Sequence, residues 1–447
     1  MMSVFRIELR RTVAPWVPVA MLVVSLGLLL FSRGPWSHGS AAWNETWLTA
    51  VRWPRYLLVL MWPIIVGAAA IQGMRDARAG VVELFGSTPR PAGQRAAKLG
   101  LALGLAAAVG YLVLVAAGVG QVVATGGLFT TAWVMQLVLG VLSVLAGVAL
   151  GLGVGRLLPY PITAPALAVL VLAGGLFTQV SGVNGVASNA VALLGIGQVA
   201  PHGPFDLPKP AVEIGQLAWL LGIAAAGIVL LLARSARIRV LALLPVGAGL
   251  AVALPLFPAS SAENYAPDET AAALVCDGPV CVTRLHEDWL STVAGPGKEV
   301  LQRLEKLPQH PTRVVESTEP YRNNKVGPRD PSQVLLQQDS TALYHKSGLS
   351  LTMTLLSGAG TTQCHAASYG GERNDREDAA RWVMAQWLVG SYSPPPSYAA
   401  LQNRTDPAWA ALKAVPEPEQ TARVAAARQL ELTCTGDPLK VLTEGGR

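Results

Sequence analysis

The four cysteines are the residues whose type and placement could most clearly do chemistry. Cys276, Cys281, Cys364 and Cys434 all fall after residue 258. An even set of cysteines confined to one segment is typical of disulfides in an oxidising compartment. Three pairings are possible, and the natural one joins Cys276 to Cys281 and Cys364 to Cys434. Four reduced thiols in a cytoplasmic domain are the alternative, and a zinc site is not expected because no paired C-x-x-C spacing occurs.

Three further motifs could carry catalysis, and each lacks a required residue. His286-Glu287-Asp288 lacks the second histidine of H-E-x-x-H, and no G-x-S-x-G frames a serine. The run 295–299, GPGKE, has neither the leading glycine nor the following Ser or Thr of an ATP-binding loop. We therefore expect no catalytic residue, no metal ligand and no cofactor in this chain, which predicts that it is not an enzyme.

The composition distinguishes an apolar first part of the chain from a more charged second part, which contains the cysteines and motifs described above. Hydrophobic residues make up 51% of the 447 residues and charged residues only 14%, whereas a soluble domain has about 25% charged residues. Residues 1–258 hold 16 Lys and Arg against 6 Asp and Glu, and residues 259–447 hold 18 against 22. The positive charge lies between apolar runs, which predicts a bilayer partner and no nucleic acid.

Seven apolar stretches are long enough to cross a bilayer core, which needs about 20 residues per helix. With a cytoplasmic amino terminus, the inner segments carry twelve Lys and Arg and the outer connections four, namely Arg33, Arg52, Arg55 and Lys209. Residues after 258 are then outside the cell. The seven stretches are residues 13–31, 57–72, 99–119, 132–155, 162–180, 214–232 and 240–256.

Charged residues are absent from the middle of each predicted span. Glu213 lies at the edge of the sixth stretch, and Gln136 and Gln216 are the main polar side chains within or beside the spans. This pattern lowers the expectation of an ion-coupled carrier, because intramembrane charges mark ion and proton paths.

Small residues recur at helical spacing in the fourth stretch. Gly147, Gly151 and Gly155 form two overlapping G-x-x-x-G steps, which let helix backbones approach closely. The stripe predicts packing within the bundle, with a dimer seam as the alternative.

Two connections between spans have unusual sequences. Residues 181–211 on the outside are apolar but broken by glycine and proline, which predicts either a re-entrant piece or a surface loop.

Residues 74–98 on the inside read MRDARAGVVELFGSTPRPAGQRAAK. Charged and small residues flank an apolar cluster there, which predicts a short amphipathic helix at the cytoplasmic surface, ended by prolines.

The inner connection resembles that of ABC-2-type transporter permease subunits. The resemblance rests on Glu83-Leu84, on residues 87–90, STPR, and on residues 96–98, AAK, leading into the third span. It implies a coupling loop that docks on a separate cytoplasmic ABC ATPase subunit, and a second permease copy or sister permease as partner. The candidate coupling residues are Arg75, Asp76, Val82, Glu83, Leu84, Phe85, Thr88, Pro89 and Arg90.

Residues 259–447 predict a domain with a core of its own. Helices are expected at 285–307, 376–388 and 417–432, and strands at 334–336 and 349–356, where apolar and polar residues alternate. The fold class is therefore an α-helical polytopic membrane protein of the cell membrane, with about seven transmembrane helices and a C-terminal α+β extracytoplasmic domain.

Two functions are compatible with this organisation. The first is the permease subunit of an ABC-type exporter, for which the lack of buried charge favours an amphipathic or lipid-like cargo over an ion. The alternative is a membrane-anchored receptor or assembly factor that acts through residues 259–447.

Overall fold

The computed structural model describes residues 13–31, 45–80, 92–197, 203–233, 235–318, 329–336, 348–364, 372–395 and 399–445. The chain divides into two compact units, residues 1–268, here called the membrane unit, and residues 269–447, here called the second unit. The predicted boundary after residue 258 is too early. Strand β2 (Tyr265–Pro267) belongs to the membrane unit because it pairs antiparallel with β1 (Asp206–Pro208).

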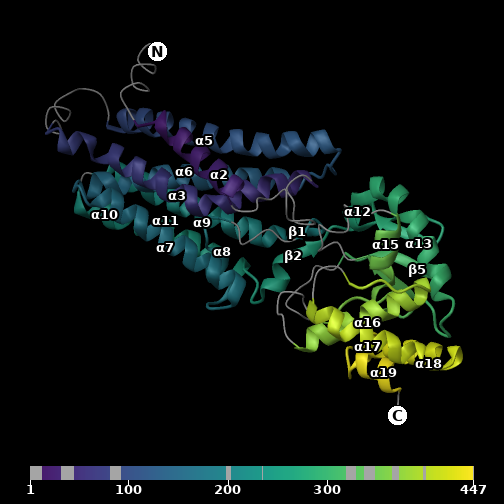
Figure 1. The fold of residues 1–447 in the computed structure, drawn as a ribbon. Coiled ribbons are helices and arrows are strands. Elements are labelled where there is room, and N and C mark those ends of the chain that lie inside the picture. The colour runs from purple at the N-terminus through teal and green to yellow at the C-terminus, as the bar shows by residue number, and fades with distance from the viewer. Residues whose placement is uncertain are drawn as a thin grey trace. The chain divides into compact units, whose positions relative to one another are not determined.

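Long apolar helices build the membrane unit (Figure 1). Helix α2 (Trp16–Phe31) is apolar but, at 16 residues, shorter than a membrane-spanning helix. Among the described residues, helical segments long and apolar enough to cross a membrane therefore lie at six of the seven predicted spans. The first predicted span, 13–31, stays a prediction. The six helical segments long and apolar enough to span are α3 (Trp47–Arg78), α5 (Ala92–Thr125), α6 (Trp133–Leu157), α7 (Thr163–Asn184), α9 (Pro210–Leu232), and α10 (Ala236–Leu241) continued by α11 (Leu243–Leu256).

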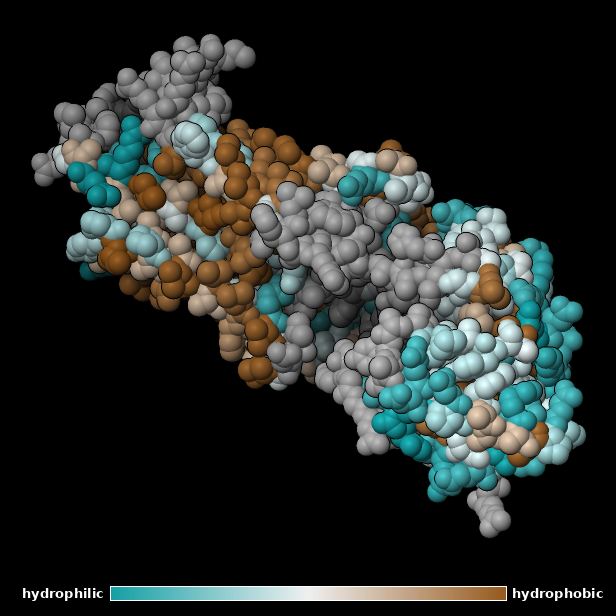
Figure 2. All heavy atoms as spheres, viewed as in Figure 1, coloured by the Kyte–Doolittle hydropathy of each residue, from teal (hydrophilic) through white to brown (hydrophobic). Residues whose placement is uncertain are grey.

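The outer faces of these helices are hydrophobic. Leu170 of α7 and Leu243 of α11 are 68% and 69% exposed. Hydrophobic side chains gather over this unit in Figure 2, whereas hydrophilic ones cover most of the second unit. Such extensive apolar surface marks contact with a bilayer, so the chain is a multi-pass membrane protein.

Helix α3 begins ten residues before the predicted span 57–72. Thr46 caps it: its Oγ1 accepts a hydrogen bond from the Thr49 backbone N–H, and Thr49 Oγ1 accepts one from the Thr46 N–H. Arg52 and Arg55 therefore lie inside the helix and are 0% and 1% exposed. The prediction that they lie in an outer connection, and that no charge is buried among the spans, is wrong.

Helix α6 packs closely against α3 through the predicted glycine stripe. A Cβ atom on Gly151 would lie 2.4 Å from the Val66 carbonyl oxygen, and one on Gly155 would lie 2.2 Å from that of Ala70. Gly147 lies in the same way against Trp62, whose indole N–H donates to the Ser143 carbonyl at 2.8 Å. The stripe is thus used for packing within the chain.

The connection 181–211, predicted to lie outside, contains the end of α7, a short helix, a strand and the start of α9 over its described part. Leu193 of α8 (Asn189–Leu193) packs against Val212 of α9 and against Ala253 and Phe257 beside it. The Asn189 amide donates to the Pro258 carbonyl at 2.7 Å and to Asn264 Oδ1 at 2.8 Å, in the 3₁₀ helix η3 (Ser261–Asn264). These bonds attach the connection to the segment that follows α11, and its entry into the bilayer stays a prediction.

The second unit is mainly helical and contains a four-stranded sheet of order β3-β4-β5-β6. Strands β3 and β4 are antiparallel, and the β4–β5 and β5–β6 pairs are parallel. The elements, in chain order, are α12 (Glu269–Ala272), β3 (Leu274–Asp277), β4 (Val280–Thr283), η4 (Arg284–Trp289), α13 (Leu290–Leu304), β5 (Arg313–Glu316), β6 (Gln333–Leu336), α15 (Gly348–Leu356), η5 (Ser357–Ala359), α16 (Glu372–Val389), α17 (Ala399–Lys413), α18 (Glu417–Thr433) and α19 (Pro438–Glu444).

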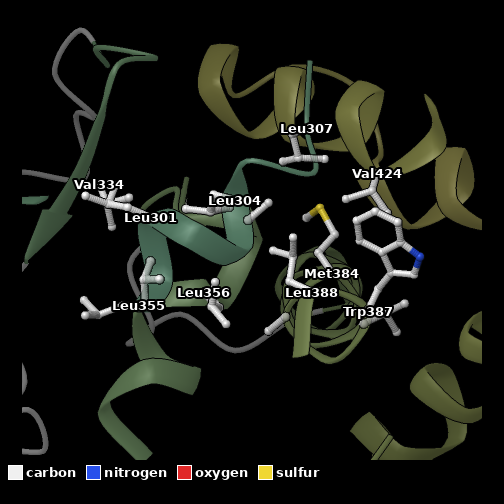
Figure 3. Packing of buried hydrophobic residues seen from close by; sticks show 14 of the residues in the cluster. Leu301, Leu304, Leu307, Val334, Leu355, Leu356, Met384, Trp387, Leu388 and Val424 are labelled. Carbon is white, nitrogen blue, oxygen red and sulfur yellow. The ribbon is translucent and has the colours of Figure 1, made fainter. Parts of the chain in front are cut away.

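A separate hydrophobic core holds the second unit together (Figure 3). Leu304 of α13, Leu356 of α15 and Leu388 of α16 are all 0% exposed. Trp387 packs into the same core and donates its indole N–H to Gln420 Oε1 at 2.9 Å. The sequence correctly predicts helices at 376–388 and 417–432 and a strand at 334–336.

The segment predicted as a strand at 349–356 is instead the helix α15. Leu351 and Leu355 fit both patterns, because positions four apart share one face of a strand and one face of a helix. Thr352 and Leu356 are also buried, which only the helix explains. The expected helix 285–307 begins with a 3₁₀ segment, η4, before α13.

Candidate functional site

The membrane unit contains a buried polar cluster centred on Arg55 of α3. Arg55 Nη1 donates to Gln136 Oε1 of α6 at 2.5 Å, and Nη2 donates to Gln216 Oε1 of α9 at 2.7 Å. Gln136 in turn donates its Nε2 to Glu213 Oε1 at 2.6 Å. One guanidinium therefore connects three membrane helices, and an amide connects it to the nearest acid.

The local sequence places Arg55, Glu213 and Gln216 at positions along their helices where they can meet. Thr46 starts α3 early enough to put Arg55 in its third turn. Pro210 starts α9, so that Glu213 lies in its first turn and Gln216 one turn later on the same face. A buried charge without partners is expensive, so helices that share such a cluster are held in one register.

Arg52 attaches the cluster to the β1–β2 pair. Its Nη1 donates to the Asp206 carbonyl at 3.0 Å, and its guanidinium lies 5.2 Å from the centroid of the Tyr265 ring. Asp206 begins β1, and Tyr265 begins β2. The helix that carries Arg55 is thereby bound to the short sheet that precedes the second unit in sequence.

A tight loop after α8 covers the same cluster. Gln216 Nε2 donates to the Leu193 carbonyl at 3.2 Å, and the Trp219 indole donates to the Leu194 carbonyl at 2.9 Å. A Cβ atom on Gly197 would lie 3.2 Å from the Arg55 carbonyl oxygen. A larger residue at this position would require the loop or α3 to shift.

The predicted coupling residues fall only partly within the described structure. Arg75 and Asp76 lie in the last turns of α3, at the opposite end from Arg52 and Arg55. The other predicted coupling residues, Val82, Glu83, Leu84, Phe85, Thr88, Pro89 and Arg90, lie outside the described residues.

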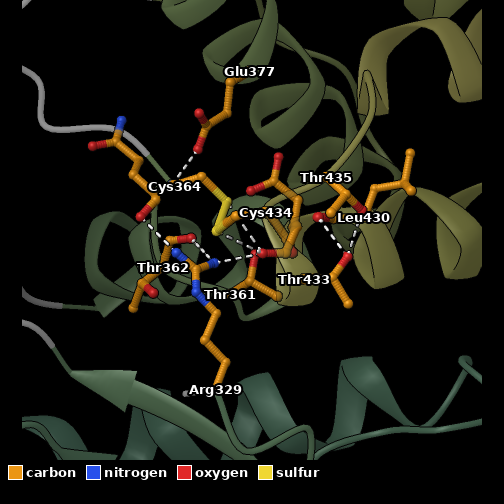
Figure 4. Close-up of a disulfide and its surroundings, with 12 residues drawn as sticks. Arg329, Thr361, Thr362, Cys364, Glu377, Leu430, Thr433, Cys434 and Thr435 are labelled. Carbon is orange, nitrogen blue, oxygen red and sulfur yellow. Dashed lines mark hydrogen bonds between the residues drawn. A yellow bond between two sulfur atoms is a disulfide. The ribbon is translucent and has the colours of Figure 1, made fainter. Parts of the chain in front are cut away.

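Both disulfides of the second unit join the cysteines in the natural pairing. Cys276–Cys281 closes the β3–β4 hairpin, whose turn contains Gly278 at φ +62°. Cys364–Cys434 ties the segment before α16 to the end of α18 (Figure 4). No free cysteine occurs among the described residues, and two disulfides indicate an oxidising compartment.

The Cys364–Cys434 disulfide lines a pocket of about 420 Å³ together with Glu377, Glu431 and Asp437. Burial raises the pKa of Glu431 to about 7, although Arg381 Nη1 lies 3.1 Å from its Oε2. Cys364 Sγ and one carboxylate oxygen each of Glu377 and Glu431 lie within 4.8 Å of one another. With the sulfur bonded in the disulfide, two carboxylates remain, fewer than the ligands of a structural or catalytic zinc site.

His286, which the sequence singles out, is buried in a separate polar group. Its Nδ1 lies 2.8 Å from Glu316 Oε1. Glu316 Oε2 accepts hydrogen bonds from the Thr283 N–H at 2.6 Å and from its hydroxyl at 2.8 Å. These contacts join β4, η4 and β5, so the role of His286 is structural.

Sequence reasoning missed the buried cluster because it placed Arg52 and Arg55 before the second span. The available signal was the capping pair Thr46 and Thr49, which indicates a helix start ten residues earlier. Glu213, Gln136 and Gln216 were recognised as the polar residues of the spans. Only the fold brings them to one arginine.

No family model matches the chain, and comparisons with curated proteins and with solved structures find no significant match. The resemblance to ABC-2 permeases accordingly stays a prediction from the sequence.

Proposed function

We propose that this chain is the permease subunit of an ABC-type exporter of the ABC-2 class, driven by a separate ATPase subunit. The observation that supports it most is the continuity of α3 (Trp47–Arg78). One helix carries buried Arg52 and Arg55 near one end and Arg75, Asp76 and Arg78 at the other. The latter end leads directly into the predicted coupling loop.

Such a helix is suited to transmit motion. At about 1.5 Å per residue its 32 residues reach about 48 Å, more than the thickness of a bilayer core. Its backbone is in contact with α6 at Gly151 and Gly155. A displacement of the coupling loop would therefore act on the interface between α3 and α6. The Arg55 bonds to Gln136 and Gln216 are then the contacts that change.

The proposed orientation places the amino terminus inside and the second unit outside. The twelve-to-four distribution of Lys and Arg supported it from the sequence. Because Arg52 and Arg55 lie in α3 and no longer count among the outer connections, the excess of Lys and Arg on the inner side becomes larger. The two disulfides of the second unit agree with an outside location.

Co-purification of an ATP-hydrolysing subunit from native membranes tests the proposal. The tagged full chain is expected to retain a nucleotide-photolabelled partner. Replacing Val82, Leu84 and Phe85 by Asp is expected to abolish it, because these residues form the apolar cluster of the coupling loop. Leu158→Asp, at an exposed leucine of the inner connection after α6, is the matched control and should retain the partner. Equal loss in both variants, or no ATPase with the intact chain, contradicts the proposal.

The pocket beside Cys364–Cys434 favours a second candidate, a membrane-anchored receptor or assembly factor. A pocket of about 420 Å³ with a buried acid is large enough for a small ligand. This alternative predicts that no ATPase associates with the intact chain and that deleting residues 269–447 alone abolishes the phenotype.

A further inference from the structure

Two buried donors in the membrane unit have no hydrogen-bond acceptor among the described residues. They are Nε of Arg55 on α3 and the hydroxyl of Tyr111 on α5. The Tyr111 side chain is 0% exposed and that of Arg55 is 1% exposed. Leaving a buried donor unsatisfied is unfavourable, and more so when the donor is charged, so both groups favour an acceptor that reaches them.

The two donors lie close to one part of α6. A Cβ atom on Gly140 would lie 2.0 Å from Tyr111 Oη, so only glycine leaves room for the phenol. Gln136, which accepts from Arg55, lies one helical turn before Gly140. The site is therefore enclosed by α3, α5 and α6.

Among the described residues, Arg55 makes its hydrogen bonds to neutral groups and not to an acid. A guanidinium offers five N–H donors, and the two bonds that Arg55 makes within the described structure both go to neutral amide oxygens. The nearest acid, Glu213, is bonded to Gln136 and not to the arginine. The missing acceptor is thus expected to carry negative charge, and the planar fork suits a phosphate or a carboxylate.

The residues of α5 that follow Tyr111 are apolar. Leu112 and Val113, the two residues after Tyr111, are 40% and 48% exposed on the outer face of α5. On the inner face, Leu114 and Val115 belong to the hydrophobic core of the membrane unit. A hydrocarbon chain attached to an anion at Tyr111 would lie along the apolar face of α5.

We infer that Arg55 and Tyr111 bind the anionic headgroup, phosphate or carboxylate, of an amphiphile whose hydrocarbon tail lies along α5. That this amphiphile is the exported cargo rests on the proposed function, whereas its binding is a property of this chain alone. Opening of the α3–α6–α9 cluster would expose further guanidinium donors of Arg55 to the same headgroup.

The test uses the purified full chain in nanodiscs of zwitterionic lipid, with ligand binding followed by native mass spectrometry. Single-chain amphiphiles of equal length are compared: an alkyl phosphate, an alkyl carboxylate, an alkyl trimethylammonium and an alkyl maltoside. The phosphate or the carboxylate is expected to bind saturably at least tenfold more tightly than the other two headgroups, and comparison of the two anions identifies the preferred one. Inorganic phosphate tests the role of the tail, because equal affinity for it overturns the amphiphile assignment.

Variants locate the binding. Arg55→Gln removes the charge and is expected to weaken binding of the anionic amphiphile tenfold or more. Tyr111→Phe keeps the shape of the core and is expected to weaken it severalfold, which keeps the inference testable if Arg55→Gln does not fold. Lys209→Gln and Tyr160→Phe are the matched controls outside the cluster, and neither should change the affinity.

Unchanged affinity in both Arg55→Gln and Tyr111→Phe means that a buried water satisfies these donors, which overturns the inference. Equal binding of the neutral maltoside overturns it as well. These outcomes are independent of ATPase association, so failure of the headgroup site and failure of the proposed export function are distinguishable.

Discussion

In the part of the membrane unit that the structure describes, the basic Arg55 and the acidic Glu213 are joined through Gln136, which accepts from Arg55 at 2.5 Å and donates to Glu213 at 2.6 Å. A neutral amide between two charges preserves a hydrogen-bonded link while keeping the guanidinium free of a carboxylate. A direct ion pair would hold the arginine more firmly and leave it less available to another anion. The amide link therefore makes the cluster both cohesive and able to exchange partners.

Replacing Gln136 by Leu is expected to destabilise the membrane unit by about 3 kcal/mol, because it leaves a buried donor of Arg55 and the Glu213 carboxylate without their partner. Thermal unfolding of the full chain in detergent, followed by tryptophan fluorescence, measures the loss. The exposed Gln94 of α5 supplies the control, and its replacement by Leu should change stability by about 0.5 kcal/mol or less. Similar losses of stability for both variants would show that the Gln136 link contributes no more to stability than an exposed glutamine does.

Gly151→Ala is expected to cost about 1–3 kcal/mol or more, because overpacking forces α3 and α6 apart. The added Cβ would lie 2.4 Å from the Val66 carbonyl oxygen and 2.6 Å from Ala69 Cβ. Gly120→Ala is the matched control, since a Cβ there meets nothing within 4 Å. The same thermal unfolding assay measures both, and a stable Gly151→Ala variant would contradict the close packing.

Removal of the Cys364–Cys434 disulfide is expected to destabilise the second unit more than removal of Cys276–Cys281. The first closes 70 residues and the second only 5. The loss of loop-closure entropy predicts costs of about 4 and about 2 kcal/mol for the paired Ser variants. Pulse proteolysis of the full chain in urea measures the stability of the second unit. A larger loss of stability on removal of Cys276–Cys281 would show that chain entropy is not the dominant effect.

The stability of the second unit is expected to fall as the pH rises from about 4.5 to about 7. Burial raises the pKa of Glu431 from 4.5 to about 7, so the folded state keeps its proton over a range in which the unfolded state loses it. The difference amounts to at most about 3 kcal/mol between pH 4.5 and 8. Urea midpoints by pulse proteolysis at pH 5 and 8 measure it. Glu431→Gln should flatten this dependence, while Glu417→Gln, at an exposed position, should leave it unchanged.

The sidedness of the second unit is testable by thiol labelling of intact cells. After mild reduction, a membrane-impermeant maleimide is expected to label Cys276, which is exposed on β3. Protection of all four cysteines in intact cells, with labelling only after permeabilisation, would reverse the proposed orientation.

The sequence alone determined the elements whose signal is local or compositional. Apolar runs defined the membrane helices, because crossing a bilayer requires about 20 apolar residues in succession. The even cysteine set predicted disulfides, and the close spacing of Cys276 and Cys281 matched a hairpin that the structure contains. Glu213, Gln136 and Gln216 were identified as polar residues of the spans, but nothing in their spacing indicated a common partner.

The tertiary structure decided what depends on neighbours distant in the chain. Alternation at 349–356 is compatible with a strand or with a helix, and the burial of Thr352 and Leu356 beside Leu351 and Leu355 selected the helix. Arg52 and Arg55 read as charges outside the membrane until α6, α9 and β1 supply their hydrogen-bond acceptors. A buried arginine is tolerated only where such partners converge, and that convergence is a property of the fold and not of any segment.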